Sequence, residues 1–199
     1  MGSRIMHFIV AQQIAERIGI EDKASFLAGG VAPDAATAKE SAHFYIGQDY
    51  TRSIDYTGFL EKYKEQKAHP YILGYYSHLI ADDLWLKGFY LPWLKNQMEH
   101  DANVLALYHQ DFRVLNGKLL DYYNLNHLGQ KAFDNQPSIV NLQEVTQQEV
   151  MQFLPYVKGD MDYDTERLQQ ELQVFTLQQI IGYIETSVEK GCLYMKHVK

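Results

Sequence analysis

The sequence contains a single cysteine, Cys192, among its 199 residues, so no disulfide can form within the chain. This excludes a disulfide-framed secreted domain and a zinc ribbon built on cysteines. Long hydrophobic runs are also absent, and no stretch approaches the roughly 20 apolar residues of a membrane-spanning helix. The first apolar run is short and is interrupted by His7, which is unlike a signal peptide. We therefore expect a cytoplasmic protein that does not insert into a membrane.

Positive charge is scarce. The chain has 18 Lys and Arg against 25 Asp and Glu, a net charge of -7, which argues against binding to duplex nucleic acid. A small anionic substrate stays compatible with this balance, because bound cations reverse the local field. With 46% hydrophobic and 22% charged residues, the composition is that of a globular protein. The length suits one domain over residues 1–199 that buries its own core.

Apolar residues recur at helical rather than strand spacing throughout, and no internal repeat is present. The fold class expected is all-α, a compact multi-helix bundle. The residues at about 70–86 are apolar almost all round, which is typical of a central buried helix, and Pro70 suits its first turn. Other helices are expected at 5–18, 23–28, 55–66, 101–123, after Thr146 and in the segment that contains residues 177–195.

Two segments read as loops. Residues 29–34 contain paired glycines and Pro33, which favour turns, so we expect a loop there between the second helix and the motifs that follow it. Residues 124–145 are polar and form a second expected loop, which we interpret as flexible.

The most informative pair is His78 and Asp82, four residues apart on the buried helix and therefore on one face of it. A buried carboxylate is costly unless it is paired, hydrogen-bonded or bound to a metal. Imidazole and carboxylate at this spacing form a common half-site for zinc. A plain hydrogen bond between the two side chains inside a helical core explains the pair equally well.

Three further residues extend this pattern. His7 lies on the first expected helix, Asp34 follows Ala32-Pro33, and His43 lies in Ser41-Ala42-His43-Phe44. Taken singly, each has a simple structural explanation, as a core histidine, a helix-capping aspartate or a loop histidine. Together with the stretch Gly74-Tyr75-Tyr76-Ser77-His78-Leu79-Ile80-Ala81-Asp82, their order resembles the zinc-dependent phospholipase C family, which is all-α and related to single-strand-specific zinc nucleases. The resemblance covers about the first half of the chain.

The resemblance implies a metal centre that hydrolyses phosphate esters. Asp34, His43, His78 and Asp82 match positions that bind one metal, and Asp82 with His7 matches those that bind a second. A hydroxide between the ions would attack phosphorus, and Asp34 would act as the catalytic proton acceptor. Two close cations lower the pKa of water and stabilise the charge on the attacking and leaving oxygens. Zinc is the expected cofactor, and mixed nitrogen and oxygen ligands also suit iron, manganese or nickel.

The sequence departs from the family pattern at two places. No signal peptide is visible whose removal would expose an amino-terminal ligand, so we consider Gly2, exposed by loss of Met1, as a ligand beside His7. No His-x-x-x-carboxylate pair follows Asp82, and we therefore expect one or two ions per chain rather than three.

Weaker features complete the site. Lys39 and Arg113 are candidate phosphate contacts, although either could be an ordinary surface cation. His78, the His100-Asp101 dipeptide and Asp121 could be arranged as in HD-type phosphohydrolases, but Asp101 is better explained as a helix cap. The sequence thus favours a metal-dependent hydrolase that acts on a small phosphoester, a phosphodiester above all. The alternative is a non-catalytic helical module that keeps a structural metal or binds a metabolite.

Overall fold

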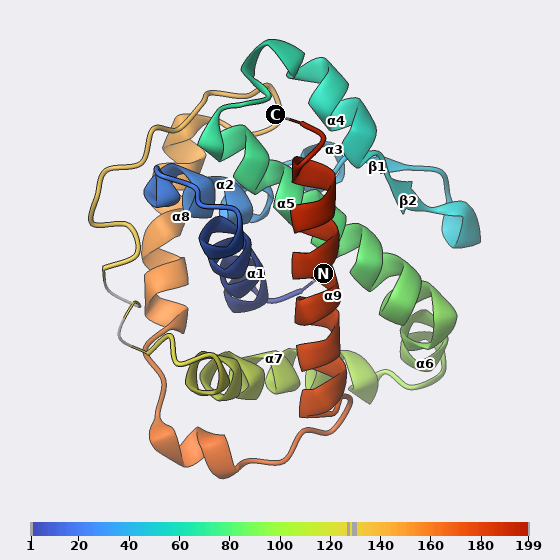
Figure 1. The fold of residues 1–199 in the computed structure, drawn as a ribbon. Coiled ribbons are helices and arrows are strands. Elements are labelled where there is room, and N and C mark those ends of the chain that lie inside the picture. The colour runs from blue at the N-terminus through green and yellow to red at the C-terminus, as the bar shows by residue number, and fades with distance from the viewer. Residues whose placement is uncertain (1, 127, 129–130, 199) are drawn as a thin grey trace.

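The predicted all-α fold is confirmed by a computed structural model that describes residues 2–126, 128 and 131–198 (Figure 1). Within these residues, strands β1 (Tyr45–Ile46) and β2 (Ser53–Ile54) pair as one antiparallel hairpin, with Tyr45 opposite Ile54. The helices are α1 (Arg4–Arg17), α2 (Lys23–Ala35), α3 (Lys39–Ala42), α4 (Tyr56–Lys62), α5 (Pro70–Trp85), α6 (Lys95–His100), α7 (Asn103–Tyr122), α8 (Gln147–Asp160) and α9 (Leu177–Met195).

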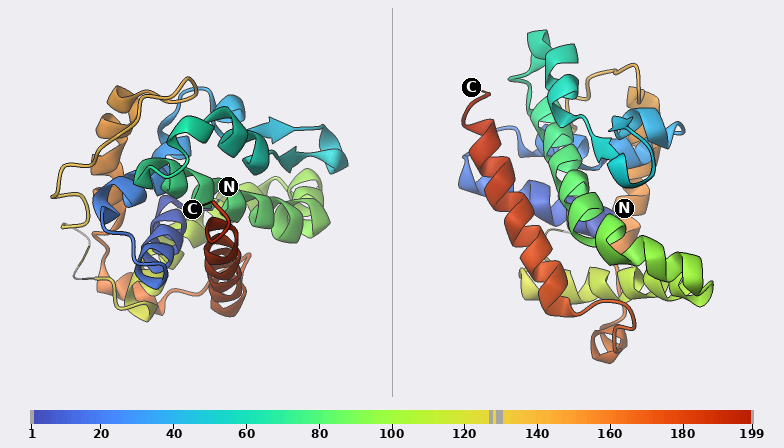
Figure 2. Two further views of the ribbon diagram at one scale, coloured as in Figure 1. Left: turned by 45° about the horizontal axis from the view of Figure 1, so that its top comes forward. Right: turned by 90° about the vertical axis from the view of Figure 1, so that its right-hand side faces the viewer.

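Helix α5 lies at the centre of the molecule, as its sequence predicts. Pro70 occupies its first turn, where no backbone donor is needed, and the imidazole of His69 accepts a hydrogen bond from the Tyr71 N–H. Every residue from Tyr71 to Asp83 is buried. Helices α1, α2 and α9 pack against α5, and the two further views show α9 running beside it (Figure 2). The polar face of α5 therefore points into protein rather than into solvent.

The chain stays helical beyond α5. A π-helical stretch, Leu86–Leu94, joins α5 to α6, and it contains Pro92. Proline cannot donate the usual backbone hydrogen bond, and wider helical turns are one way to accommodate it. The expected helix at 55–66 is shorter than predicted, because α4 ends at Lys62 and a 3-10 turn follows at Lys64–Gln66.

The loop predicted at residues 29–34 is wrong, because α2 continues to Ala35 with Pro33 inside it. The paired glycines serve packing between helices rather than a turn. A Cβ at Gly29 would lie 2.0 Å from the Tyr71 carbonyl oxygen, and one at Gly74 would lie 1.9 Å from the Phe26 carbonyl oxygen. Glycine at these positions lets the backbones of α2 and α5 touch, and this tertiary contact outweighs the weak local preference for a turn.

The segment at 124–145 has no helix or strand among its described residues, as expected for a loop. It is nevertheless attached to the body of the molecule. The Ser138 N–H donates to the Ser25 hydroxyl at 2.7 Å, and five apolar side chains are buried: Leu125, Phe133, Ile139, Leu142 and Val145. The flexibility of this segment stays a prediction.

The segment after α2 is held by the start of α8. Thr146 and Glu149 form a capping box, and the same Glu149 carboxylate accepts hydrogen bonds from the backbone and hydroxyl of Thr37. These bonds from Thr146 and Thr37 lower the pKa of Glu149 to about 2. The chain between Asp34 and Lys39 is thereby fixed at Thr37. Among the residues that the structure describes, no helix combines the length and the apolar character needed to cross a membrane.

We expect Gly74→Ala to destabilise the protein, because its new methyl group would meet the Phe26 carbonyl. Overpacking of this kind costs about 1–3 kcal/mol, more than the roughly 1 kcal/mol that alanine gains over glycine in a helix. Gly182→Ala on α9 is the matched control, since nothing lies within 4 Å of its Cβ position. Urea unfolding followed by circular dichroism should show a lower midpoint for Gly74→Ala and an equal or higher one for Gly182→Ala. Equal midpoints for the two variants would contradict the close contact between α2 and α5.

Candidate metal centre

Four separate segments bring the five predicted ligands together. His7 comes from α1, Asp34 from the last turn of α2, and His43 from the residue that ends α3. His78 and Asp82 leave the same face of α5, as their spacing predicts. The side chains of His7, His78 and Asp82 are fully buried, that of His43 is 5% exposed, and that of Asp34 is 17% exposed.

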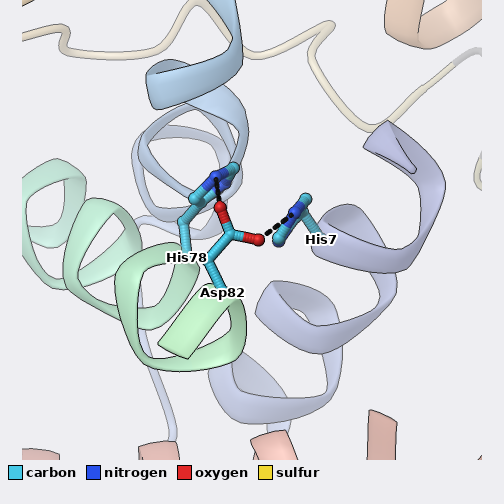
Figure 3. Close-up of side chains that lie close together, drawn as sticks. All are labelled: His7, His78 and Asp82. Carbon is cyan, nitrogen blue, oxygen red and sulfur yellow. Dashed lines mark ion pairs between the residues drawn. The ribbon is translucent and has the colours of Figure 1, made fainter. Parts of the chain in front are cut away.

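Asp82 is the centre of this cluster. Its Oδ1 lies 3.3 Å from Nε2 of His7, and its Oδ2 lies 3.3 Å from Nε2 of His78 and 3.4 Å from Nε2 of His43. Figure 3 shows the carboxylate beside the rings of His7 and His78, with one oxygen directed to each. Those two rings are themselves stacked, with centroids 3.7 Å apart. One carboxylate thus faces three imidazoles.

Asp34 completes a second group with two of the same histidines. Its Oδ1 lies 3.5 Å from Nε2 of His43, and the Nε2 atoms of His43 and His78 are 3.3 Å apart. Donor atoms of His7, His78 and Asp82 lie within 4.8 Å of one another, and so do those of Asp34, His43 and His78. His78 belongs to both groups. Its ring offers only Nε2, so it can bind one ion at a time. The donors are therefore compatible with one ion at either group, or with two ions that share Asp82, whose Oδ1 faces His7 and whose Oδ2 faces His78 and His43.

Backbone carbonyls orient two of the three rings. Nδ1 of His78 lies 2.9 Å from the Gly30 carbonyl oxygen, and Nδ1 of His43 lies 2.8 Å from the Lys39 carbonyl oxygen. Each Nδ1 therefore carries a proton and donates it, which leaves Nε2 turned toward the carboxylates: an N–H donor when the ring is protonated, and a lone pair for a metal when the ring is neutral. This is the arrangement in which proteins present histidine to a metal. Neither carbonyl contact was predicted from the sequence. Only the four-residue spacing of Lys39 and His43 indicates that the Lys39 carbonyl could lie near the His43 ring.

Several polar atoms of the cluster have no hydrogen-bond partner among the described residues. Both ring nitrogens of His7 and both carboxylate oxygens of Asp82 are buried without a hydrogen-bond partner in the described part of the chain. Leaving buried polar groups unpaired is expensive, by about 1–3 kcal/mol for each neutral group and more for a charge. A cation that accepts the lone pairs of the imidazoles and carboxylates removes this cost. The residues present therefore fit a metal ion.

Both carboxylates are in the ionised form that a metal requires. Burial alone raises the pKa of Asp34, but its hydrogen bond with His43 and the positive charges of His78 and His7 outweigh burial and bring that pKa far below its usual value. Burial of Asp82 is likewise outweighed by nearby positive charge, that of His7 and His78 included, and its pKa lies well below the ordinary range. Two nitrogen-rich groups with anionic oxygens suit a borderline metal such as zinc better than calcium or magnesium.

A pocket of about 460 Å³ adjoins the cluster through Asp34. Gly2, Lys39 and Arg113, which the sequence analysis singled out, all line it. Gly2 also lies against His7, since a Cβ at Gly2 would be 3.2 Å from the His7 Nε2. The other polar side chains of this wall were not predicted from the sequence, among them His109 and Asn116, which share one face of α7 with Arg113.

The arrangement of an HD-type phosphohydrolase is not present in the described residues. His100 is exposed and bonds only to the Asn96 carbonyl, and the Asp101 carboxylate accepts a hydrogen bond from the Asn103 N–H at the start of α7. Asp121 is exposed as well. None of the three belongs to a group of metal donors. Asp101 therefore lies just before Ala102, the N-cap residue of α7, and binds the first N–H of the helix, which is close to the capping role that the sequence favours.

Comparison with known proteins does not place the chain in a family. No family model, no curated protein and no solved structure matches it.

We expect zinc to stabilise the folded protein through this cluster. After chelator treatment, zinc at about a hundred times its Kd should contribute about 2.7 kcal/mol and raise the unfolding temperature by about 5–10 °C. His78→Ala removes the residue that both groups share and should abolish the rise. His100→Ala, an exposed histidine outside the cluster, is the matched control and should keep it. A thermal melt with the same rise in His78→Ala as in the wild type would place the zinc elsewhere.

Proposed function

We propose that the protein is a metal-dependent hydrolase of phosphate esters, similar in chemistry to the zinc-dependent phospholipase C family. The observation that carries the proposal is the donor cluster around Asp82, which opens through the partly exposed Asp34 onto a polar pocket. His7, Asp34, His43, His78 and Asp82 would hold one or two ions, with zinc the best match and iron, manganese or nickel compatible. Such ions lower the pKa of water and stabilise negative charge on phosphoryl oxygens.

The residues of the chain have distinct tasks in this proposal. Asp34 is the only member of the cluster that also lines the described pocket, so its carboxylate is the group best placed to take a proton from attacking water. The rings of His43 and His78 are held through their Nδ1 atoms. Their Nε2 atoms therefore stay on the side of the cluster where Asp34 lies. Asp82 supplies negative charge at the point where the two donor groups meet. Lys39 and Arg113 give the pocket positive charge that attracts a phosphoester. Gly2 beside His7 could add its amino group if Met1 is removed.

The same cluster supports a second candidate, a helical module with a structural metal. Four of the five ligand side chains are at most 5% exposed, as in a coordinatively closed structural site. The exposure of Asp34 and the adjoining pocket favour catalysis over this alternative.

We expect metal-loaded protein to hydrolyse bis-p-nitrophenyl phosphate, as followed by release of p-nitrophenolate with zinc, iron, manganese or nickel added in turn. Asp34→Asn should lower kcat/KM by about 10²-fold or more, because loss of a general base costs about 10²–10⁴ in rate. His78→Ala should abolish turnover. Asp121→Asn and His100→Ala are matched exposed controls and should be as active as the wild type.

Two results would count against the hydrolase. Turnover that survives both Asp34→Asn and His78→Ala would come from a contaminant. Metal bound stoichiometrically without turnover of any phosphodiester would favour the structural metal site.

A further inference from the structure

The pocket beside the donor cluster is lined by more cationic than acidic side chains, although the protein has a net charge of -7. Arg4, Lys39 and Arg113 line it, together with the titratable His109. The acidic residues of the lining are Asp34, which belongs to the metal cluster, and Asp160. At about 460 Å³, the pocket holds much more than one phosphate group, so an ester bound at Asp34 leaves room there for another part of the ligand.

The three cationic side chains differ in the contacts that they already make within the protein. Nε of Arg4 pairs with Oδ2 of Asp160 at 2.7 Å, so their charges offset each other. Nζ of Lys39 donates to the backbone carbonyl oxygen of Asp34. Arg113 has neither an ion pair nor a hydrogen bond with any residue that the structure describes. Its guanidinium therefore keeps all five donors for a ligand.

Asn116 provides a second, independent sign of a missing ligand. It follows Arg113 by three residues on α7, so the two side chains leave the same face of the helix. Asn116 is only 8% exposed, and its side-chain Oδ1 is buried without a hydrogen-bond partner among the described residues. An amide that lines a pocket in this state offers an acceptor and N–H donors at one place. The unpaired atom is an acceptor, so a ligand group that donates a hydrogen bond, such as a hydroxyl, would satisfy it, and an anionic oxygen would not.

We propose that this pocket is an oxyanion subsite, in which Arg113 is the principal contact and Lys39 lies beside the bound group, while Oδ1 of Asn116 accepts a hydrogen bond from a hydroxyl of the same ligand. The ligand would be a phosphoester whose second arm carries its own negative charge, a phosphate or a carboxylate. The planar guanidinium of Arg113 matches two oxygens of either group. Assignment of the anion to a substrate rests on the proposed hydrolase function, whereas binding of the anion can be measured without turnover.

Sulfate is the probe for the test, because it is a tetrahedral dianion like phosphate. Backbone and arginine side-chain NMR signals of the zinc-loaded protein are followed as sodium sulfate replaces sodium chloride at constant ionic strength, which keeps charge screening fixed. Sodium acetate in a parallel titration distinguishes a carboxylate from a phosphate-like group. Residues 109–116 should show saturable shifts with at least one of the two anions.

Arg113→Gln should weaken that binding at least tenfold, and Arg113→Lys should weaken it less, because it keeps the charge but loses the fork of donors. Arg167→Gln, at an exposed arginine that does not line this pocket, is the matched control and should bind as the wild type does. Arg113 is exposed, so its variants should fold, and their spectra outside the pocket should overlay that of the wild type. Absence of saturable shifts along α7, or equal affinity in Arg113→Gln, would overturn the subsite.

The subsite and the hydrolase can fail separately. Hydrolysis of bis-p-nitrophenyl phosphate without Arg113-dependent anion binding would keep the hydrolase and overturn the subsite. Arg113-dependent binding in a protein that hydrolyses no phosphodiester would keep the anion site and overturn its assignment to a substrate.

Discussion

A buried carboxylate surrounded by three imidazoles constrains how the helices of this protein can pack. Asp82 is fully buried, and its oxygens lie 3.3–3.4 Å from Nε2 of His7, His43 and His78. Each histidine comes from a different segment, so α1, the end of α3 and α5 must all converge on one point. Burial of this charge is too costly to tolerate without positive partners. A metal ion meets that requirement with the donors as they stand.

Close contact between the backbones of α2 and α5 positions the cluster. Gly29 and Gly74 leave no room for a Cβ between the two helices, and the same approach brings the Gly30 carbonyl within 2.9 Å of Nδ1 of His78. Packing thereby fixes the tautomer of a ligand as well as its position. Asp34 lies near the C-terminal end of the same α2 helix, so the element that orients His78 also places the carboxylate that meets the pocket.

Much of this could be predicted from the sequence, because helical spacing is a local property. The run from Pro70 identifies the central helix, and the four-residue spacing of His78 and Asp82 puts both side chains on one face. Convergence of His7, Asp34 and His43 on that face depends on contacts between distant segments, which spacing does not contain; there the family resemblance supplied the prediction. The helical course of residues 29–34 was missed because their glycines serve tertiary packing. Asn116 was missed because an unpaired amide is recognised only from its surroundings.

Elemental mass spectrometry of untagged protein, purified without chelator and alongside His78→Ala, tests the account most directly. The cluster predicts about two equivalents of one transition metal in the wild type, because the two oxygens of Asp82 face different histidines, and loss of that metal in the variant. One equivalent would restrict the ion to one of the two groups. Folded wild-type protein without any bound metal would contradict the account, since His7, His78 and Asp82 would then be a hydrogen-bonded core cluster.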